Sequence, residues 1–461
     1  MKRFVLLALV AAFVLGTFGM ASAETKVTMS GEHYTTFQWA KSVNGATNAF
    51  TEKDGEDTFY ARQRSRIYMN FEANENVKAT YGFEIGDLTW GHTESLTPVG
   101  SATAQDIGGA TGGDFGADGI NIKTKRAMVA FTVPNTDLKV TMGIQGMALP
   151  IAVAAANPIF NGDVAGITAS YAFNDMFSAT ALWARVKDNN GTDIAGSSWA
   201  DEEDGIGLIL SIAPVQGLSL KPYYLYGMIG QDVVGGNVAT KDESAWWLGM
   251  STQLTMFDPI VVLWDVMYGS YDGATDARDK AGWSTDIAVA YKMDFMTPTL
   301  VFHYGTGDDS TATDGSEGLP TLGHDTNYAI TNLGTDGNIG RSSASKLIGT
   351  ATKTDAGMGV MGIGLVLDKI TFVENLSNTL KIVYYKGTND KSLMTATPAT
   401  FTEEDSAWEI NLDTTYQLYE NLSAVVELGY VNVDWDDNAA RGSNFLDEDA
   451  YKLAFSLIYK F

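Results

Sequence analysis

The sequence predicts an all-β fold, a closed transmembrane antiparallel β-barrel of 18 strands, with 16 strands as the alternative. Three observations predict it: apolar and polar residues alternate along many segments, short connectors alternate with long polar ones, and after residue 23 no apolar run approaches membrane-helix length. Glycine and aromatic residues are abundant although the mean hydropathy is average. A secreted all-β protein is the other class that fits this composition.

The first 23 residues have the three-part layout of a secretory signal. Two basic residues precede an apolar run from Phe4 to Leu15, and the segment ends in Ala-Ser-Ala, a small-residue cleavage site. The run is short and is followed by glycines, whereas a spanning helix needs about 20 apolar residues. We therefore expect a signal peptide at 1–23 and a barrel domain at 24–461.

The charge and the rare residue types exclude several classes of function. The formal net charge is −26, which argues against a nucleic-acid partner because such partners need basic surfaces. There is no cysteine, so disulfides and thiol chemistry are excluded. The four histidines have neither a metal-like spacing nor a neighbouring serine motif, so we expect no metal, no cofactor and no enzymatic activity. Acidic loop clusters lack the spacing of a calcium loop, and we interpret them as solvated charge or as divalent-bridged contacts with lipopolysaccharide.

The connectors separate the predicted strands. Short turns, such as 74–76 and 420–421, alternate with long polar stretches, such as 91–120 and 306–356. This asymmetry is typical of bacterial barrels with short periplasmic turns and long extracellular loops. A barrel of this size is too wide for side chains to fill, so a water-filled lumen is predicted. The predicted strands are 25–40, 58–73, 77–90, 121–134, 137–147, 163–173, 176–188, 205–214, 217–230, 244–257, 260–271, 283–295, 298–305, 357–370, 378–388, 405–419, 422–435 and 449–461.

One stretch, ARQRSRIYMNFEAN at 61–74, places arginine at every second position. On a strand these arginines share one face, while Ile67, Met69 and Phe71 share the other. Charge on a lipid face costs about 2–4 kcal/mol at the midplane, so the arginines are predicted to face the lumen. The predicted basic row consists of Arg62, Arg64, Arg66 and, from the next strand in the same direction, Arg126.

Four segments resemble the homotrimeric outer-membrane porins of sulfate-reducing delta-proteobacteria and, more distantly, the general diffusion porins: ETKVTMSGEHYTTFQWAK, FEANENVKATYGFEIGDLTWG, FTVPNTDLKVTMGIQGMALP and GDVAGITASYAFND. The resemblance is strongest in 24–190 and in the last strand. It implies a homotrimer in the bacterial outer membrane that contacts membrane lipids and lipopolysaccharide and passes small hydrophilic solutes. By the same resemblance, Tyr459 and Phe461 match the terminal signal that the barrel-assembly machinery reads.

The resemblance also implies that the third long loop folds into the pore opposite the arginine row. The matching loop is 146–162, and its candidate constriction residues are Met147, Leu149, Pro150, Ile151, Pro158 and Phe160. Unlike general porins, this loop has no charged residue before Asp163. The counter-charges of the arginines therefore stay open, with Asp114, Asp118, Glu409 and Asp413 as candidates. The loop either forms an apolar constriction or packs against the barrel wall or a neighbouring subunit.

The expected function is passive diffusion of ions and small hydrophilic solutes, with the arginine row tuning selectivity. Acidic loops attract cations, whereas the row favours anions, so we predict weak selectivity, with anions favoured at low salt if the row lines the narrowest point. A substrate-specific porin for a sugar or an organic anion is the alternative, and a surface adhesin barrel is less favoured. Five tryptophans do not share an inward phase, and most are interpreted as rim or lipid-interface anchors: Trp183, Trp246, Trp247, Trp264 and Trp283.

Overall fold

The computed structural model describes residues 25–41, 58–91, 122–154, 156–188, 202–230, 242–310, 315–322, 359–395, 401–436 and 448–461. The signal peptide predicted at 1–23 lies outside these ranges. The described strands are β1 (Lys26–Lys41), β2 (Thr58–Asn74), β3 (Val77–Thr89), β4 (Ile122–Thr132), β5 (Lys139–Ala148), β6 (Asn161–Asn174), β7 (Phe177–Asp188), β8 (Glu202–Ile212), β9 (Leu218–Ile229), β10 (Glu243–Phe257), β11 (Ile260–Asp272), β12 (Lys280–Tyr291), β13 (Thr297–Gly305), β14 (Val360–Val373), β15 (Leu376–Gly387), β16 (Ser406–Tyr419), β17 (Leu422–Asp434) and β18 (Glu448–Lys460).

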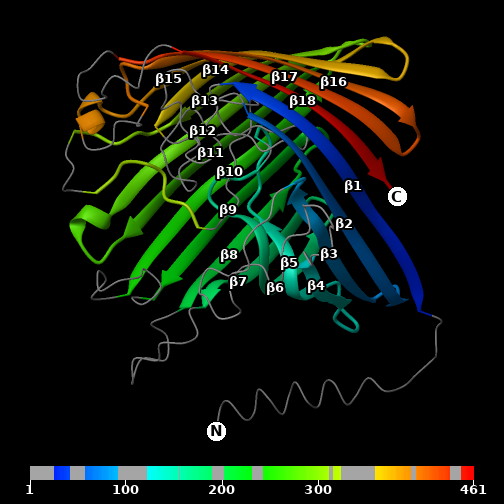
Figure 1. Ribbon diagram of the computed structural model, residues 1–461. Coiled ribbons are helices and arrows are strands. Elements are labelled where there is room, and N and C mark those ends of the chain that lie inside the picture. Colours follow the sequence, from blue (N-terminus) through cyan, green and yellow to red (C-terminus); the bar gives the residue numbers. More distant parts are fainter. Residues whose placement is uncertain are drawn as a thin grey trace.

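The 18 strands form one closed antiparallel sheet. Each strand pairs with its neighbours in sequence, and β1 also pairs with β18, from Glu32 opposite Lys460 to Lys41 opposite Tyr451. Figure 1 shows this seam, with the blue first strand beside the red last strand. The predicted count of 18 is confirmed and the alternative of 16 is wrong.

Several strand ends differ from the prediction by two or three residues. β8, for example, begins at Glu202 rather than 205, because Glu202 and Glu203 still pair with the end of β7 although the apolar alternation has stopped. Two short 3-10 helices, η1 (Asp276–Arg278) and η2 (Lys391–Thr395), lie in connectors. No helix in the described part of the chain is both long enough and apolar enough to cross a membrane.

Asparagine forms many of the tight turns. Asn135 and Asn375 have φ values of 61° and 60°, a left-handed conformation that asparagine tolerates better than most residues. Asn74 and Asn174 each accept, through the side-chain oxygen, a hydrogen bond of 2.9 Å from the backbone N–H two residues later. These turns define the short-turn end of the barrel, and the long connectors define the long-loop end.

The outward face of the sheet is an apolar belt. On β10, Ala245 and Trp247 are buried, whereas Trp246 and Leu248 are exposed. Successive residues of the strand therefore alternate between the inside and the outside of the barrel. On β16 the outward residues run from Trp408 through leucine and isoleucine to tyrosines near the short-turn end. An exposed apolar band with aromatic residues at both edges is the surface expected of a lipid-embedded barrel.

Part of the interior is filled by apolar side chains from the connector between β5 and β6. Leu149, Ile159 and Phe160 of the connector and Met147 at the end of β5 belong to one buried cluster with inward residues of β7, β9, β10 and β11. Ala154 belongs to a second cluster, made with inward residues of β1 and of β12 to β18. The connector therefore lies inside the barrel and against its wall.

Candidate functional site

The predicted arginine row faces the interior. On β1, which pairs with β2, Tyr34 lies opposite Arg64 and Thr36 opposite Arg62, and both β1 residues are buried while outward Trp39 is exposed. Directly opposed residues of antiparallel strands lie on the same face of the sheet, so the arginines of β2 point inward. We call the inner faces of β2, β3 and β4 the arginine wall.

Carboxylates of β3 neutralise part of this wall. Arg62 donates from Nε to Asp87 Oδ1 at 2.9 Å, and its Nη2 lies 2.8 Å from the same oxygen. Glu84 is shared, because its Oε2 accepts from Arg66 Nε at 2.8 Å and lies 3.7 Å from Arg64 Nη1. The guanidinium of Arg64 also lies over the ring of Tyr34, 5.0 Å from its centroid, a cation–π arrangement.

Arg126 also belongs to the arginine wall. It follows a register shift in β4 and lies opposite Gly82, which in turn faces Tyr68 on β2. Its Nη1 pairs with the carboxylate of Asp163 at the start of β6, and Lys125 Nζ lies 2.5 Å from the same carboxylate. The guanidinium of Arg126 passes over Gly146, where a Cβ would overlap with it.

The carboxylates that the structure places beside these arginines are Glu84, Asp87 and Asp163, and none of them is among the predicted counter-charges. Glu409 and Asp413 face inward and are buried, as the alternation indicated, and Asp413 Oδ2 lies 3.8 Å from Lys381 Nζ. Glu409 accepts a hydrogen bond of 2.8 Å from Asn411. Asp114 and Asp118, the other predicted counter-charges, lie outside the described residues.

The arginine wall remains in contact with solvent. The exposed fractions of its arginine side chains are 27 % for Arg62, 16 % for Arg64, 31 % for Arg66 and 23 % for Arg126. The guanidinium groups of the arginine wall are therefore only partly buried inside the barrel.

The opposite part of the interior is buried. Asp265 on β11, Asp286 on β12 and His303 on β13 lie directly opposite one another, and none is more than 1 % exposed. His303 Nδ1 and Asp286 Oδ1 are 2.8 Å apart. We call the inner faces of β7 to β13 the covered wall, because the β5–β6 connector and residues 315–322 lie against them.

The β5–β6 connector is held by hydrogen bonds as well as by apolar contacts. Asp265 accepts from the backbone N–H groups of Ala152 and Val153 at 2.8 to 2.9 Å. Asn157, fully buried, donates to Pro150 O at 2.9 Å and to the hydroxyl of Tyr223 at 3.2 Å. These bonds fold the connector onto the covered wall.

The candidate constriction residues are divided between the wall and the interior. Met147, Leu149, Pro158 and Phe160 are buried, whereas Pro150 and Ile151 are half-buried, and Ile151 packs against both apolar clusters. The structure thus places the connector inside the barrel and packs it on the wall at the same time. Its role as the narrowest point stays a prediction.

A second segment, 315–322, covers the same wall and was not predicted to do so. Leu322 N donates to Ile159 O at 2.7 Å, which joins the two segments. Trp247 Nε1 donates to Pro320 O at 2.7 Å. Trp247 is therefore an inward residue, an exception to its interpretation as a rim anchor. The other four tryptophans of that group alternate with buried residues and face outward: Trp183, Trp246, Trp264 and Trp283.

The two predicted terminal-signal residues lie at the seam between β18 and β1. Tyr459 and Phe461 are on the outward face, with ring centroids 5.8 Å apart. Phe461 exchanges backbone hydrogen bonds with Gly31, at 2.8 and 3.1 Å, and its ring lies where a Cβ of Gly31 would be. Glycine at 31 therefore leaves room for the terminal ring.

At the long-loop end, η1 carries an ion pair. Arg278 donates to both carboxylate oxygens of Glu243, at 2.6 and 2.8 Å, and these hydrogen bonds raise the pKa of the guanidinium. The acidic cluster 272–279 also orders itself internally, because Asp279 accepts from Gly273 N at 2.8 Å. Among the residues with described positions, no group of three histidine or carboxylate side chains is arranged to hold a metal ion.

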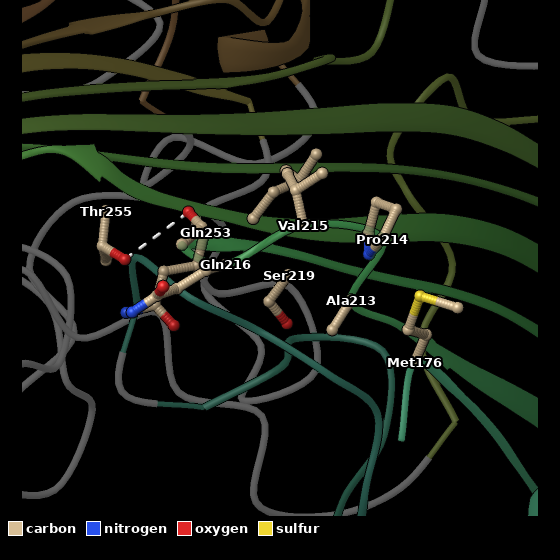
Figure 2. A pocket seen from close by; sticks show the side chains of 10 residues that line it. Met176, Ala213, Pro214, Val215, Gln216, Ser219, Gln253 and Thr255 are labelled. Atoms are coloured by element: carbon tan, nitrogen blue, oxygen red, sulfur yellow. Dashed lines mark hydrogen bonds between the residues drawn. The ribbon is translucent and has the colours of Figure 1, made fainter. Parts of the chain in front are cut away.

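A cavity of about 620 Å³ lies at the short-turn end. The turns at 176 and 213–218 and the ends of β9 and β10 line it. Figure 2 shows its uncharged side chains, among them Gln216, Ser219, Gln253 and Thr255. None of the residues that line this cavity is charged.

The fold is shared with solved outer-membrane porins. The structure resembles Acinetobacter baumannii OccAB1 with a TM-score of 0.55 at 12 % identity, over 95 % of this chain and 99 % of that one. It resembles Pseudomonas aeruginosa OpdQ with a TM-score of 0.53 at 12 % identity (94 % and 97 % covered) and P. aeruginosa OprD with 0.51 at 14 % identity (96 % and 98 % covered). No protein-family model and no curated protein matches the sequence. The closed barrel, its apolar belt and these likenesses indicate a protein of the bacterial outer membrane.

Proposed function

We propose that the protein is an outer-membrane channel through which ions and small hydrophilic solutes diffuse passively. The observation that carries this proposal is the partly exposed arginine wall inside a barrel whose opposite wall is buried. The aqueous route then runs beside β2, β3 and β4. The proposal assigns the protein no catalytic step.

The arginine wall favours anions along this route. Guanidinium groups bind carboxylates and sulfate through paired hydrogen bonds. In this barrel the arginines already form ion pairs with carboxylates of the protein. These ion pairs reduce the positive electrostatic potential of the arginine wall, so we expect only a weak preference for anions. The preference is largest at low salt, where screening is least.

Planar-bilayer recording of the purified protein tests the proposal. We expect stable ohmic conductance steps in potassium chloride, together with swelling of proteoliposomes in small neutral sugars. A well-folded barrel that gives neither conductance nor swelling would contradict a diffusion channel and favour the surface-adhesin interpretation.

A substrate-specific channel is the second candidate, because two inward segments narrow the interior and the OprD/Occ porins that the structure resembles include substrate-specific channels. An organic anion is the substrate class that fits the arginine wall, and a sugar is the other. Millimolar dicarboxylate or sugar should then block the ion current in a saturable way. Conductance that follows the bulk conductivity of the added solution favours the general channel.

We also propose that the barrel forms a homotrimer through the outward face of β1 and β2. There, His33 Nδ1 lies 2.8 Å from Ser65 Oγ, and Gln63 accepts from Trp90 Nε1 at 3.0 Å. Ser65 lies midway along β2 between the outward rings of Phe59 and Phe71, a depth at which polar groups are costly in lipid. Contact with another subunit would remove these groups from lipid.

Cysteine cross-linking tests the trimer, since the natural chain has no cysteine. Gln63→Cys should yield cross-linked oligomers in membranes, and Ile410→Cys, on the outward face of β16, is the matched control. Cross-links at residue 410 but not at residue 63 would contradict the assigned face. Barrel-assembly machinery that reads Tyr459 and Phe461, and lipopolysaccharide at the long-loop end, complete the proposed partners.

A further inference from the structure

The contact between Asp265 and the β5–β6 connector differs from the other contacts on the covered wall. Both carboxylate oxygens of Asp265 lie 2.9 Å from the N–H nitrogen of Ala152, and Oδ2 also lies 2.8 Å from that of Val153. Successive backbone N–H groups that converge on one anion form a compact anion-binding arrangement. The tip of the connector is thus bound to a barrel strand 113 residues away in sequence.

The surroundings of Asp265 strengthen this contact. Asp265 is 1 % exposed. It lies directly opposite Ser251 of the neighbouring strand β10, which hydrogen-bonds to it. Hydrogen bonds to a charged acceptor are stronger than neutral ones, and a buried carboxylate depends on them. On its other side, Asp265 faces Asp286, whose carboxylate in turn contacts His303.

Apart from those of Asp265, the hydrogen bonds described for the connector involve residues near its two ends. Leu149 N donates to Phe160 O at 3.0 Å, and Ile159 O accepts from Leu322 N at 2.7 Å. Asn157 fixes the returning limb to Tyr223 at 3.2 Å. Between these points, Ala154 is buried in the second apolar cluster, but Ala152 and Val153 are only half-buried. The polar contacts described for the tip are the hydrogen bonds to Asp265.

We infer that Asp265 is the positioning residue that holds the connector tip inside the barrel and thereby sets the width of the aqueous route. This inference rests on the proposed channel function. An asparagine amide at 265 keeps one acceptor oxygen but places a donor NH2 where the other oxygen accepts, so the paired acceptor of the two backbone N–H groups is lost. These N–H groups regain full partners most easily when the tip moves into water. The route then widens from the side of the covered wall, while the arginine wall is unchanged.

The test compares Asp265→Asn with Glu427→Gln. Glu427 on β17 is an equally buried inward carboxylate that faces Asp413 rather than the connector, so its variant removes the same charge and leaves the tip in place. We expect Asp265→Asn to raise single-channel conductance at least about 1.5-fold over Glu427→Gln and to admit larger neutral sugars in liposome swelling. Neutral sugars report width and are insensitive to the lost charge.

A double variant provides a reversible form of the test. Ala152→Cys with Asp265→Cys places two cysteines at the present contact, in a chain that otherwise has none. The oxidised protein should show the narrow channel, and reductant should convert it to the wide one. A variant that failed to fold would be recognised by the loss of heat-modifiable migration on gels and would not show this reversal.

Elastase cleavage separates a failure of this inference from a failure of the channel proposal. The connector is rich in alanine and valine, which elastase cleaves, and we expect it to be protected in the natural protein and in Glu427→Gln but cut in Asp265→Asn. If elastase cleaves only Asp265→Asn but none of the three proteins conducts ions, the positioning role is supported and the channel proposal is contradicted. Unchanged conductance, sugar cut-off and protection in Asp265→Asn would overturn the inference.

Discussion

The arginine wall and the covered wall both carry charged residues inside one barrel, yet they differ in access to water. Arginine side chains on β2 and β4 are 16 to 31 % exposed, whereas Asp265, Asp286 and His303 are almost fully buried. The β5–β6 connector and residues 315–322 lie against the covered wall and bury its inward side chains. In the proposed channel, the charges that reach a solute are therefore set by how the loops fold inward rather than by the net charge of −26.

The two walls also balance their charges differently. On the arginine wall, four arginines contact three carboxylates, Glu84, Asp87 and Asp163, so positive charge remains in excess among these groups. On the covered wall, a carboxylate binds backbone N–H groups of the connector. In the proposed channel, the charge of the arginine wall would act on solutes, whereas the carboxylate of Asp265 holds the connector.

The largest expected effect comes from uncovering the covered wall. Replacing residues 150–158 with a short glycine-serine turn removes the tip and its contact with Asp265. We expect conductance to rise about two- to threefold, because pore width limits ion flow. Folding is checked by circular dichroism, and an unchanged conductance in folded protein would mean that the route does not pass the connector.

Chemical labelling measures access to the two walls directly. Tyr68→Cys lies on the arginine wall and Ser284→Cys on the covered wall, where Ser284 is fully buried. Since only a solvent-accessible thiolate reacts, a small water-soluble thiol reagent should modify residue 68 at least about ten times faster than residue 284. Equal rates would show that the walls do not differ in access to water.

A smaller effect is expected from the charge balance of the arginine wall. Glu84→Gln removes the carboxylate shared by Arg64 and Arg66 and leaves an amide of similar shape. Under a tenfold potassium chloride gradient, the reversal potential should move toward anions by roughly 5 mV at low salt and by less at high salt. A shift toward cations would contradict this balance. The lost hydrogen bonds should lower the free energy of unfolding by about 1–3 kcal/mol.

Local patterns in the sequence predict the strands and the inward phase of the arginines, because a period of two requires no knowledge of distant contacts. The sequence also contains enough information to predict the partner of Arg66. A hairpin that turns at 74–76 puts Asn70 opposite Thr80 and Arg66 opposite Glu84, as the structure does. The pattern that predicts the arginine row uses a single strand, so it does not identify Glu84 and Asp87, which lie on the neighbouring strand.

The covered wall could not be predicted in this way. Asp265 contacts Ala152 across 113 residues, and Trp247 contacts Pro320 across 73. Neither pair has a local periodicity or a shared turn that would bring it together. The inward fold of the β5–β6 connector was expected from the family resemblance, but its anchor on β11 depends on packing that only the three-dimensional structure reveals.

The most direct test of the account is the reversal potential of single channels under a potassium chloride gradient, for the natural protein and for Arg62/Arg64/Arg66→Gln. If the aqueous route follows the arginine wall, the variant leaves Glu84 and Asp87 in the route without their arginines, and selectivity shifts clearly toward cations while conductance persists. The same reversal potential in both proteins would place the ion path elsewhere and contradict the account.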